Sequence, residues 1–230
     1  MKDFSKLEKT LGLKFKNHDI FKQAFVHRSY INENPAFNLA HNERLEFLGD
    51  AVLELIVTEY LYQHYANPEG ELTNWRASLV NGQMLAKLAN HLGLEEYLYL
   101  SKGEAKDKNV KARNYILANC FEALIGAIYL DQGYDPAKKL IHQFLIPELP
   151  NILDNQLYKD PKSKFQEMAQ EKTGITPSYR VIKESGPDHA KKFQVGVYLD
   201  GELIATNTGS SKQEAQVKAA QRALIKKNWD

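Results

Sequence analysis

The chain has 230 residues, 43% of them hydrophobic and 26% charged, which allows ordinary globular cores and argues against a disordered or fibrous protein. Its single cysteine, Cys120, excludes an intrachain disulfide and a thiolate zinc cluster, and no run approaches the roughly 18 apolar residues that span a bilayer, so a soluble cytoplasmic protein without a membrane partner is expected. The formal charge of +1 is uneven, because residues 160–230 hold 12 Lys and Arg against 9 Asp and Glu and the rest of the chain is slightly acidic.

Residues 1–155 predict an all-helical domain. The pattern after these residues changes, and residues 156–160 are expected to form a linker. Breakers at 67–70 and the polar stretch 102–111 predict loops. Apolar residues recur at three- and four-residue spacing over residues 20–25, 45–65, 75–92, 115–130 and 136–146.

Residues 161–230 predict a small α+β domain with the order α-β-β-β-α. Helical spacing covers 162–172 and 211–227, and alternation predicts strands at 178–184, 192–199 and 202–208. Asp200 and Gly201 between two alternating runs are typical of a tight hairpin, and Ser211 is placed to cap the last helix.

An acidic face is predicted on the helix that follows Asn42. Glu43, Glu46 and Asp50 stand at i, i+3 and i+7, so their carboxylates share one face of a helix that is otherwise largely apolar. Carboxylates on a buried helix need partners, and a hard divalent cation is one candidate. The spacing by itself leaves open a plain solvated face.

A second apolar helix carries Asn119 and Glu122 at i and i+3. Two such helices could build an oxygen-ligand Mg²⁺ site, at which a water is activated for phosphodiester hydrolysis.

Several segments of the sequence resemble those of a known family. Residues 42–53, NERLEFLGDAVL, look like the ribonuclease III signature. The resemblance extends to LGLKFKNHDIFKQAFVHRSY from Leu11, EGELTNWRASLVNGQMLAKLA from Glu69 and ILANCFEALIGAIYLDQGY from Ile116, in the order of the bacterial family. It implies a helical endonuclease domain and a C-terminal double-stranded RNA-binding domain.

The resemblance also implies an activity and roles for residues. It implies a homodimeric endoribonuclease that hydrolyses double-stranded RNA with Mg²⁺, or Mn²⁺ in its place, and no organic cofactor. Cleavage would leave 5′-phosphate and 3′-hydroxyl ends with short 3′ overhangs, in processing of ribosomal and other structured RNA precursors. Asp50, Glu122 and Glu43 match catalytic positions, and the metal ligands implied are Glu46, Asp50, Asn119 and Glu122.

Asn119 departs from the family, which usually has Asp there. An amide oxygen can bind Mg²⁺, but the site loses one negative charge and metal affinity should fall. The alternative to an active nuclease is a slow or non-cleaving protein that binds double-stranded RNA. A helical hydrolase of small nucleotides would explain the carboxylates but not residues 161–230.

The resemblance further implies binding surfaces. Phe47 matches an aromatic residue that plugs a cavity in the partner subunit, although a core phenylalanine would look the same in sequence. In the second domain, Gln166, Glu167 and His189 would face the RNA minor groove. Lys212 and Lys218 would bind phosphates. The alternative is that such lysines are ordinary solvated surface charges.

Overall fold

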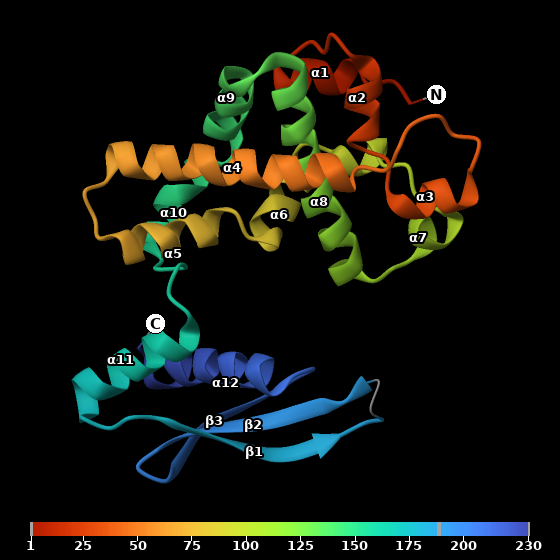
Figure 1. Cartoon of the computed structure of the whole chain (residues 1–230). Coiled ribbons are helices and arrows are strands. Elements are labelled where there is room, and N and C mark those ends of the chain that lie inside the picture. Colours follow the sequence, from red (N-terminus) through yellow and green to blue (C-terminus); the bar gives the residue numbers. More distant parts are fainter. Residues whose placement is uncertain (1, 188–189, 230) are drawn as a thin grey trace. The chain divides into compact units, whose positions relative to one another are not determined.

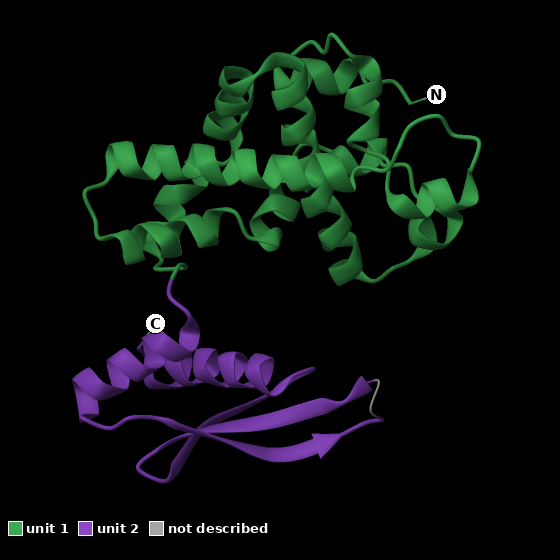
Figure 2. Cartoon of the chain, in the orientation of Figure 1, with its two compact units in different colours: residues 1–158 green, residues 159–230 purple. Residues whose placement is uncertain are grey.

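The computed structural model describes residues 2–187 and 190–229. The chain divides into two compact units, Met1–Tyr158 and Lys159–Asp230, which Figure 2 colours separately. The division falls within residues 156–160, where the sequence predicts a linker. Each unit has a hydrophobic core of its own.

The first unit is helical, as predicted. Within its described residues, the extended pairing is an isolated bridge between Val26 and Tyr99. No helix of the described chain is long and apolar enough to cross a membrane. The helices are α1 (Ser5–Leu11), α2 (His18–Gln23), α3 (Arg28–Glu33), α4 (Glu43–His64), α5 (Glu69–Leu79), α6 (Gly82–His91), α7 (Lys102–Lys106), α8 (Val110–Gln132), α9 (Tyr134–Phe144) and α10 (Leu149–Asp154).

The two longest helices, α4 and α8, organise this unit. Helix α8 is apolar on nearly every side through its middle, where Phe121, Ile125 and Ile128 are fully buried, and a helix of that kind can only be a core element. Helix α4 buries Leu53 and Ile56 and crosses α8, as Figure 1 shows. The crossing brings together the two stretches that the sequence predicts to carry the acidic residues.

The predicted single helix at residues 75–92 is wrong. Helix α5 ends at Leu79 and α6 begins at Gly82. Between them, the Asn81 side chain accepts hydrogen bonds from the amides at the start of α6 and caps that helix. The apolar spacing continues through the break, which is why periodicity alone missed it.

The predicted loops at 67–70 and 102–111 are also too long. Helix α5 already begins at Glu69. The short α7 lies within the second stretch, because Ser101 caps its start, and Asn109 caps the start of α8. Both caps are local hydrogen bonds between side chain and backbone, and in a polar stretch the residues that form them look the same as loop residues.

The second unit has the predicted α-β-β-β-α order. Its strands form one antiparallel sheet in the order β1-β2-β3, and the β2–β3 turn places Asp200 at φ 47° and Gly201 at φ 80°, the left-handed pair of a tight hairpin. The elements are α11 (Pro161–Thr173), β1 (Ser178–Ser185), β2 (Lys192–Leu199), β3 (Glu202–Gly209) and α12 (Lys212–Lys227).

Both helices of this unit pack on one face of the sheet. Val197 from β2 is buried with Phe165 of α11 and Ala220 of α12. The predicted cap at Ser211 is confirmed, because its hydroxyl accepts a hydrogen bond of 3.1 Å from the amide of Glu214.

Candidate active site

The acidic residues meet because α4 and α8 cross with their backbones in contact. A Cβ built on Gly49 would lie 1.8 Å from the carbonyl oxygen of Glu122, and one built on Gly126 would lie 2.2 Å from a backbone oxygen of α4. Only glycine allows two backbones to approach this closely. Since Asp50 follows Gly49 and Glu46 precedes it by three residues, the contact fixes both carboxylates beside α8.

Four side chains form what we call the acidic cluster: Glu46, Asp50, Asn119 and Glu122. Burial, followed by the negative charges of Asp50 and Glu46, raises the pKa of the Glu122 carboxyl to about 7. Burial and the charges of Glu43 and Asp50 also raise the pKa of Glu46, while a hydrogen bond from the Asn119 amide opposes that rise. These mutual effects place the four side chains in one neighbourhood.

The donor atoms and charges of the acidic cluster suit a hard divalent cation. All four side chains offer oxygen, the ligand atom that Mg²⁺ and Mn²⁺ prefer. The charges that raise the pKa of Glu122 are all negative, and a bound cation would offset them.

The acidic cluster is not a preformed metal site, however. Among the described residues, no three His, Cys, Asp or Glu side chains are grouped so as to hold a metal ion. Three members of the acidic cluster are carboxylates, and the fourth, Asn119, is an amide.

Glu43 lies outside the cluster, at the first residue of α4. Its carboxylate stands 3.7 Å from the Arg28 guanidinium and 3.7 Å from Nδ1 of His41, and its side chain is about half exposed. Its charge still contributes to the raised pKa of Glu46. Glu43 therefore lies on the rim of the cluster, held by two side chains from the preceding segment that local helix periodicity gives no reason to expect.

Asn42 anchors the start of α4. It is 4% exposed, its amide nitrogen Nδ2 donates to the carbonyl of Ala24 over 3.1 Å, and its backbone N–H donates to the carbonyl of Val26 over 2.9 Å. A buried polar side chain with this double attachment fixes where α4 begins. Asn42 thus positions Glu43 and Glu46, a role that the sequence analysis did not assign.

Phe47 points away from the core. It is 81% exposed, which excludes the core-phenylalanine alternative within this chain. Leu55 and Tyr62 are 57% and 80% exposed, and with Phe47 they lie at i, i+8 and i+15 on α4. Those positions share one helical face, so α4 presents an uncovered apolar stripe (Phe47, Leu55 and Tyr62) along its length.

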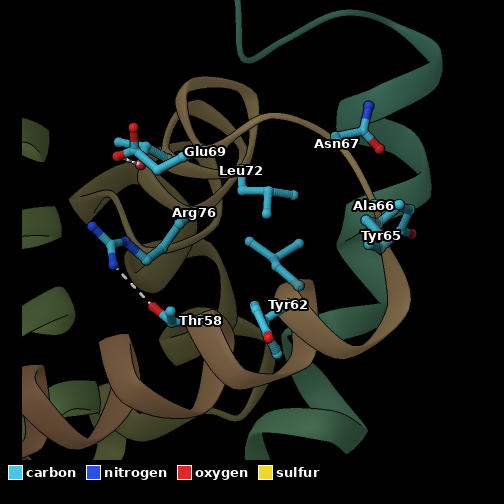
Figure 3. Close-up of a pocket in the computed structure, with 10 residues that line it drawn as sticks. Thr58, Tyr62, Tyr65, Ala66, Asn67, Glu69, Leu72 and Arg76 are labelled. Carbon is cyan, nitrogen blue, oxygen red and sulfur yellow. Dashed lines mark hydrogen bonds between the residues drawn. The ribbon is translucent and has the colours of Figure 1, made fainter.

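A pocket of about 600 Å³ opens at the far end of this stripe, between α4 and α5. Leu61, Tyr62 and Leu72 contribute to its apolar lining. On its rim the Arg76 guanidinium donates a hydrogen bond of 2.9 Å to the Thr58 hydroxyl, as Figure 3 shows. No local sequence pattern predicts this pocket, because its walls come from two helices that are joined by a loop.

The predicted RNA-binding residues of the second unit divide into two groups. Gln166 and Glu167 are exposed on α11. Lys212 and Lys218 lie on α12, but each has an acidic neighbour: Lys212 is 3.3 Å from Glu184, and Lys218 is 2.8 Å from Glu214. His189 lies outside the described residues.

Each of the two units of the chain matches a family model. A model described as "Ribonuclease-III-like" matches residues 17–149, and a model described as "Double-stranded RNA binding motif" matches residues 161–227.

Two relatives that match over nearly the whole chain are both named Ribonuclease 3. Ribonuclease 3 of a Nitratiruptor species is 43% identical over 97% of this chain and 96% of its own length. Ribonuclease 3 of a Sulfurovum species is 44% identical over 97% of this chain and 98% of its own length.

Among solved structures, the nuclease domain of ribonuclease III from Campylobacter jejuni matches with a TM-score of 0.57 and 37% identity, over 64% of this chain and 99% of that one. The description of that structure mentions a region involved in dimer formation.

Proposed function

The chain belongs to the ribonuclease III family, and on that premise we propose that the acidic cluster at the crossing of α4 and α8 is the site at which it hydrolyses double-stranded RNA. As a member of the family it is an endoribonuclease with a double-stranded RNA-binding domain. The observation that carries the assignment is the backbone contact of Gly49 with Glu122, which holds carboxylates from two crossing helices at one place.

In the proposal, Glu46, Asp50, Asn119 and Glu122 hold Mg²⁺, for which Mn²⁺ can substitute. The family is metal-dependent, and the bound cation would activate a water and offset negative charge on the reacting phosphate. Asp50 and Glu122 are the carboxylates closest to the chemistry. Because the pKa of Glu122 is about 7, this carboxyl carries a proton in part of the metal-free molecules at neutral pH, and loading the site releases that proton.

Glu43 has a different role in the proposal. Its ion pair with Arg28 and its contact with His41 keep it at the rim, so its charge would act both on the cluster and on RNA that approaches the cluster. Arg28, with its side chain 67% exposed, brings a cation to that rim.

The second unit would hold the duplex by its shape. Gln166, Glu167 and His189 are assigned to the minor groove, and Lys212 and Lys218 to phosphates. The carboxylates of Glu184 and Glu214 compete with phosphate for those two lysines, so the contribution of this unit to affinity should be moderate.

We also propose a homodimer formed through the apolar stripe on α4. Phe47 and Tyr62 lie at nearly equal distances from Leu55, on opposite sides. Two α4 helices that pack antiparallel about a two-fold axis near Leu55 would therefore place Phe47 of each copy at the α4–α5 pocket of the other. The pocket volume of about 600 Å³ leaves ample room for a phenylalanine side chain.

The same packing fixes the separation of the two sites. At about 1.5 Å per residue along α4 and about 9 Å between helix axes, the two copies of Asp50 would stand about 16 Å apart. Two sites with that separation suit cleavage of both strands of one duplex. Ribosomal and other structured RNA precursors in the cytoplasm are the proposed substrates.

The test is cleavage of a long RNA duplex by the purified protein, with and without Mg²⁺, beside Glu122→Gln. Mg²⁺-dependent cutting that is lost in the variant is the expected result. Tight binding of the duplex without cutting by the unaltered chain would instead support the non-cleaving alternative that Asn119 raises.

A further inference from the structure

Tyr115 stands out on α8 because a large aromatic side chain is left uncovered there. It is 68% exposed, although the residues that follow it, Ile116 and Leu117, are buried. No described residue bonds to its hydroxyl. Tyr115 belongs to the N-terminal part of α8. Figure 1 shows that this end of the helix extends past the crossing with α4.

Its position relative to the acidic cluster follows from helix geometry. Tyr115, Asn119 and Glu122 stand at i, i+4 and i+7 within the continuous helix α8, so they lie within about 60° of one another around the axis. Four residues correspond to a rise of about 6 Å. The phenol ring is therefore one helical turn from Asn119, on the side of α8 that faces the cluster.

This location matters for a polyanionic substrate. A duplex whose cleaved phosphate reaches the acidic cluster must lay the neighbouring nucleotides along the surface beside it. A tyrosine hydroxyl can donate a hydrogen bond without adding charge, and its ring has few rotatable bonds to restrain.

We propose that the Tyr115 hydroxyl forms a hydrogen bond with an oxygen of the sugar–phosphate backbone, on a nucleotide next to the cleaved bond. The inference rests on the proposed site at the acidic cluster. Tyr115 in this role is a substrate contact, and it takes no part in proton transfer or metal binding.

The main test compares Tyr115→Phe with the unaltered full-length protein on a short RNA duplex that has one cleavage site. The change removes one oxygen atom from an exposed side chain, so the thermal midpoint should stay the same. A single lost hydrogen bond should lower kcat/KM about 2- to 10-fold. Tyr129→Phe, on the same helix but partly packed on the core, is the matched control and should leave kcat/KM unchanged.

A second set of duplexes, each with one 2′-deoxy nucleotide near the cleavage site, distinguishes the two kinds of oxygen. If the contact is a 2′-hydroxyl, one of these duplexes is cleaved more slowly by the unaltered protein, and Tyr115→Phe causes no further loss on it. If the contact is a phosphate oxygen, the loss caused by Tyr115→Phe persists on every duplex.

An unchanged kcat/KM for Tyr115→Phe overturns the inference, provided that Glu122→Gln abolishes cleavage in the same assay. Continued cleavage by Glu122→Gln would instead overturn the proposed site itself, so the two failures are distinguishable.

Discussion

Gly49 and Glu122 touch through their backbones, at a distance that leaves no room for a side chain on Gly49. This contact sets the spacing of the two helices that carry the acidic cluster. Glycine inside a helix costs roughly 1 kcal/mol relative to alanine, so its presence in the middle of α4 is explained by the approach of α8.

Gly49→Ala should therefore destabilise the protein and abolish cleavage together. The added Cβ would force α4 and α8 apart, at a cost of about 3 kcal/mol or more in free energy of unfolding. Chemical denaturation followed by circular dichroism measures this. Gly70→Ala in α5 is the control, because nothing lies within 4 Å of a Cβ at that position, and it should be neutral or stabilising by up to about 1 kcal/mol. Equal stability of the two variants would contradict the contact.

Local sequence patterns predict most of the fold but a smaller part of the site. Apolar periodicity identified α4 and α8, and the i, i+3, i+7 spacing placed Glu46 and Asp50 correctly on one face. It placed Glu43 on that face too, in keeping with the contribution of its charge to the raised pKa of Glu46, but it gave no sign that Glu43 also contacts Arg28 and His41. Both residues precede α4 in the chain, so the periodicity of that helix cannot predict contacts with them.

One signal for the crossing was present in the sequence. A glycine in the interior of an apolar helix is unfavourable unless something approaches closely, and Gly49 and Gly126 both fit that description. The pocket beside Tyr62 had no comparable signal, because its shape depends on how α5 lies against α4.

Asn119→Asp should lower the Mg²⁺ concentration that gives the half-maximal cleavage rate, by several-fold. The change adds one negative charge and one strong oxygen ligand to the acidic cluster. Initial rates across a Mg²⁺ titration measure the shift. Asn114→Asp adds the same charge to α8 away from the cluster face and should leave the requirement where it is. An unaltered requirement in Asn119→Asp would show that position 119 does not limit metal binding.

Phe47→Asp should convert the proposed dimer into monomers. A carboxylate at the place where Phe47 enters the partner's pocket would be desolvated without a counter-charge. Sedimentation velocity over a range of protein concentrations measures the change. Leu130→Asp alters a residue of α8 that is 55% exposed and lies off the apolar stripe, and it should leave the association unchanged. A dimer of equal strength in Phe47→Asp would place the interface elsewhere.

Glu184→Gln should strengthen binding of duplex RNA. The Lys212 and Lys191 ammonium groups hold the pKa of Glu184 below its usual range, and Lys212 also lies 5.5 Å from the Phe193 ring centre. Without the carboxylate, Lys212 can turn to a phosphate, so affinity should rise a few-fold at low salt with a steeper salt dependence. Fluorescence anisotropy at several salt concentrations tests this. Glu171→Gln makes the same change in net charge, and a similar gain there would indicate a general charge effect.

Glu122→Gln should stabilise the metal-free protein at pH 8 but not at pH 4. The pKa of Glu122 is about 7 in the folded chain, above the ordinary value near 4.5, so folding favours the protonated form. Below pH 4.5 the carboxyl is neutral in both states and costs nothing; between about pH 4.5 and 7 the unfolded chain loses the proton first, and the stability of the unaltered protein falls with rising pH.

Glutamine has no charge to bury, so the variant escapes that loss. After allowance for solvent screening of a partly exposed carboxyl, the gain at pH 8 should be about 1 to 2 kcal/mol. Thermal unfolding in EDTA at both pH values measures it, with Glu171→Gln as the control for removing a carboxylate as such. A gain of equal size at pH 4 and pH 8 would mean that Glu122 acts through packing, and that the repulsion within the acidic cluster does not weaken the metal-free fold.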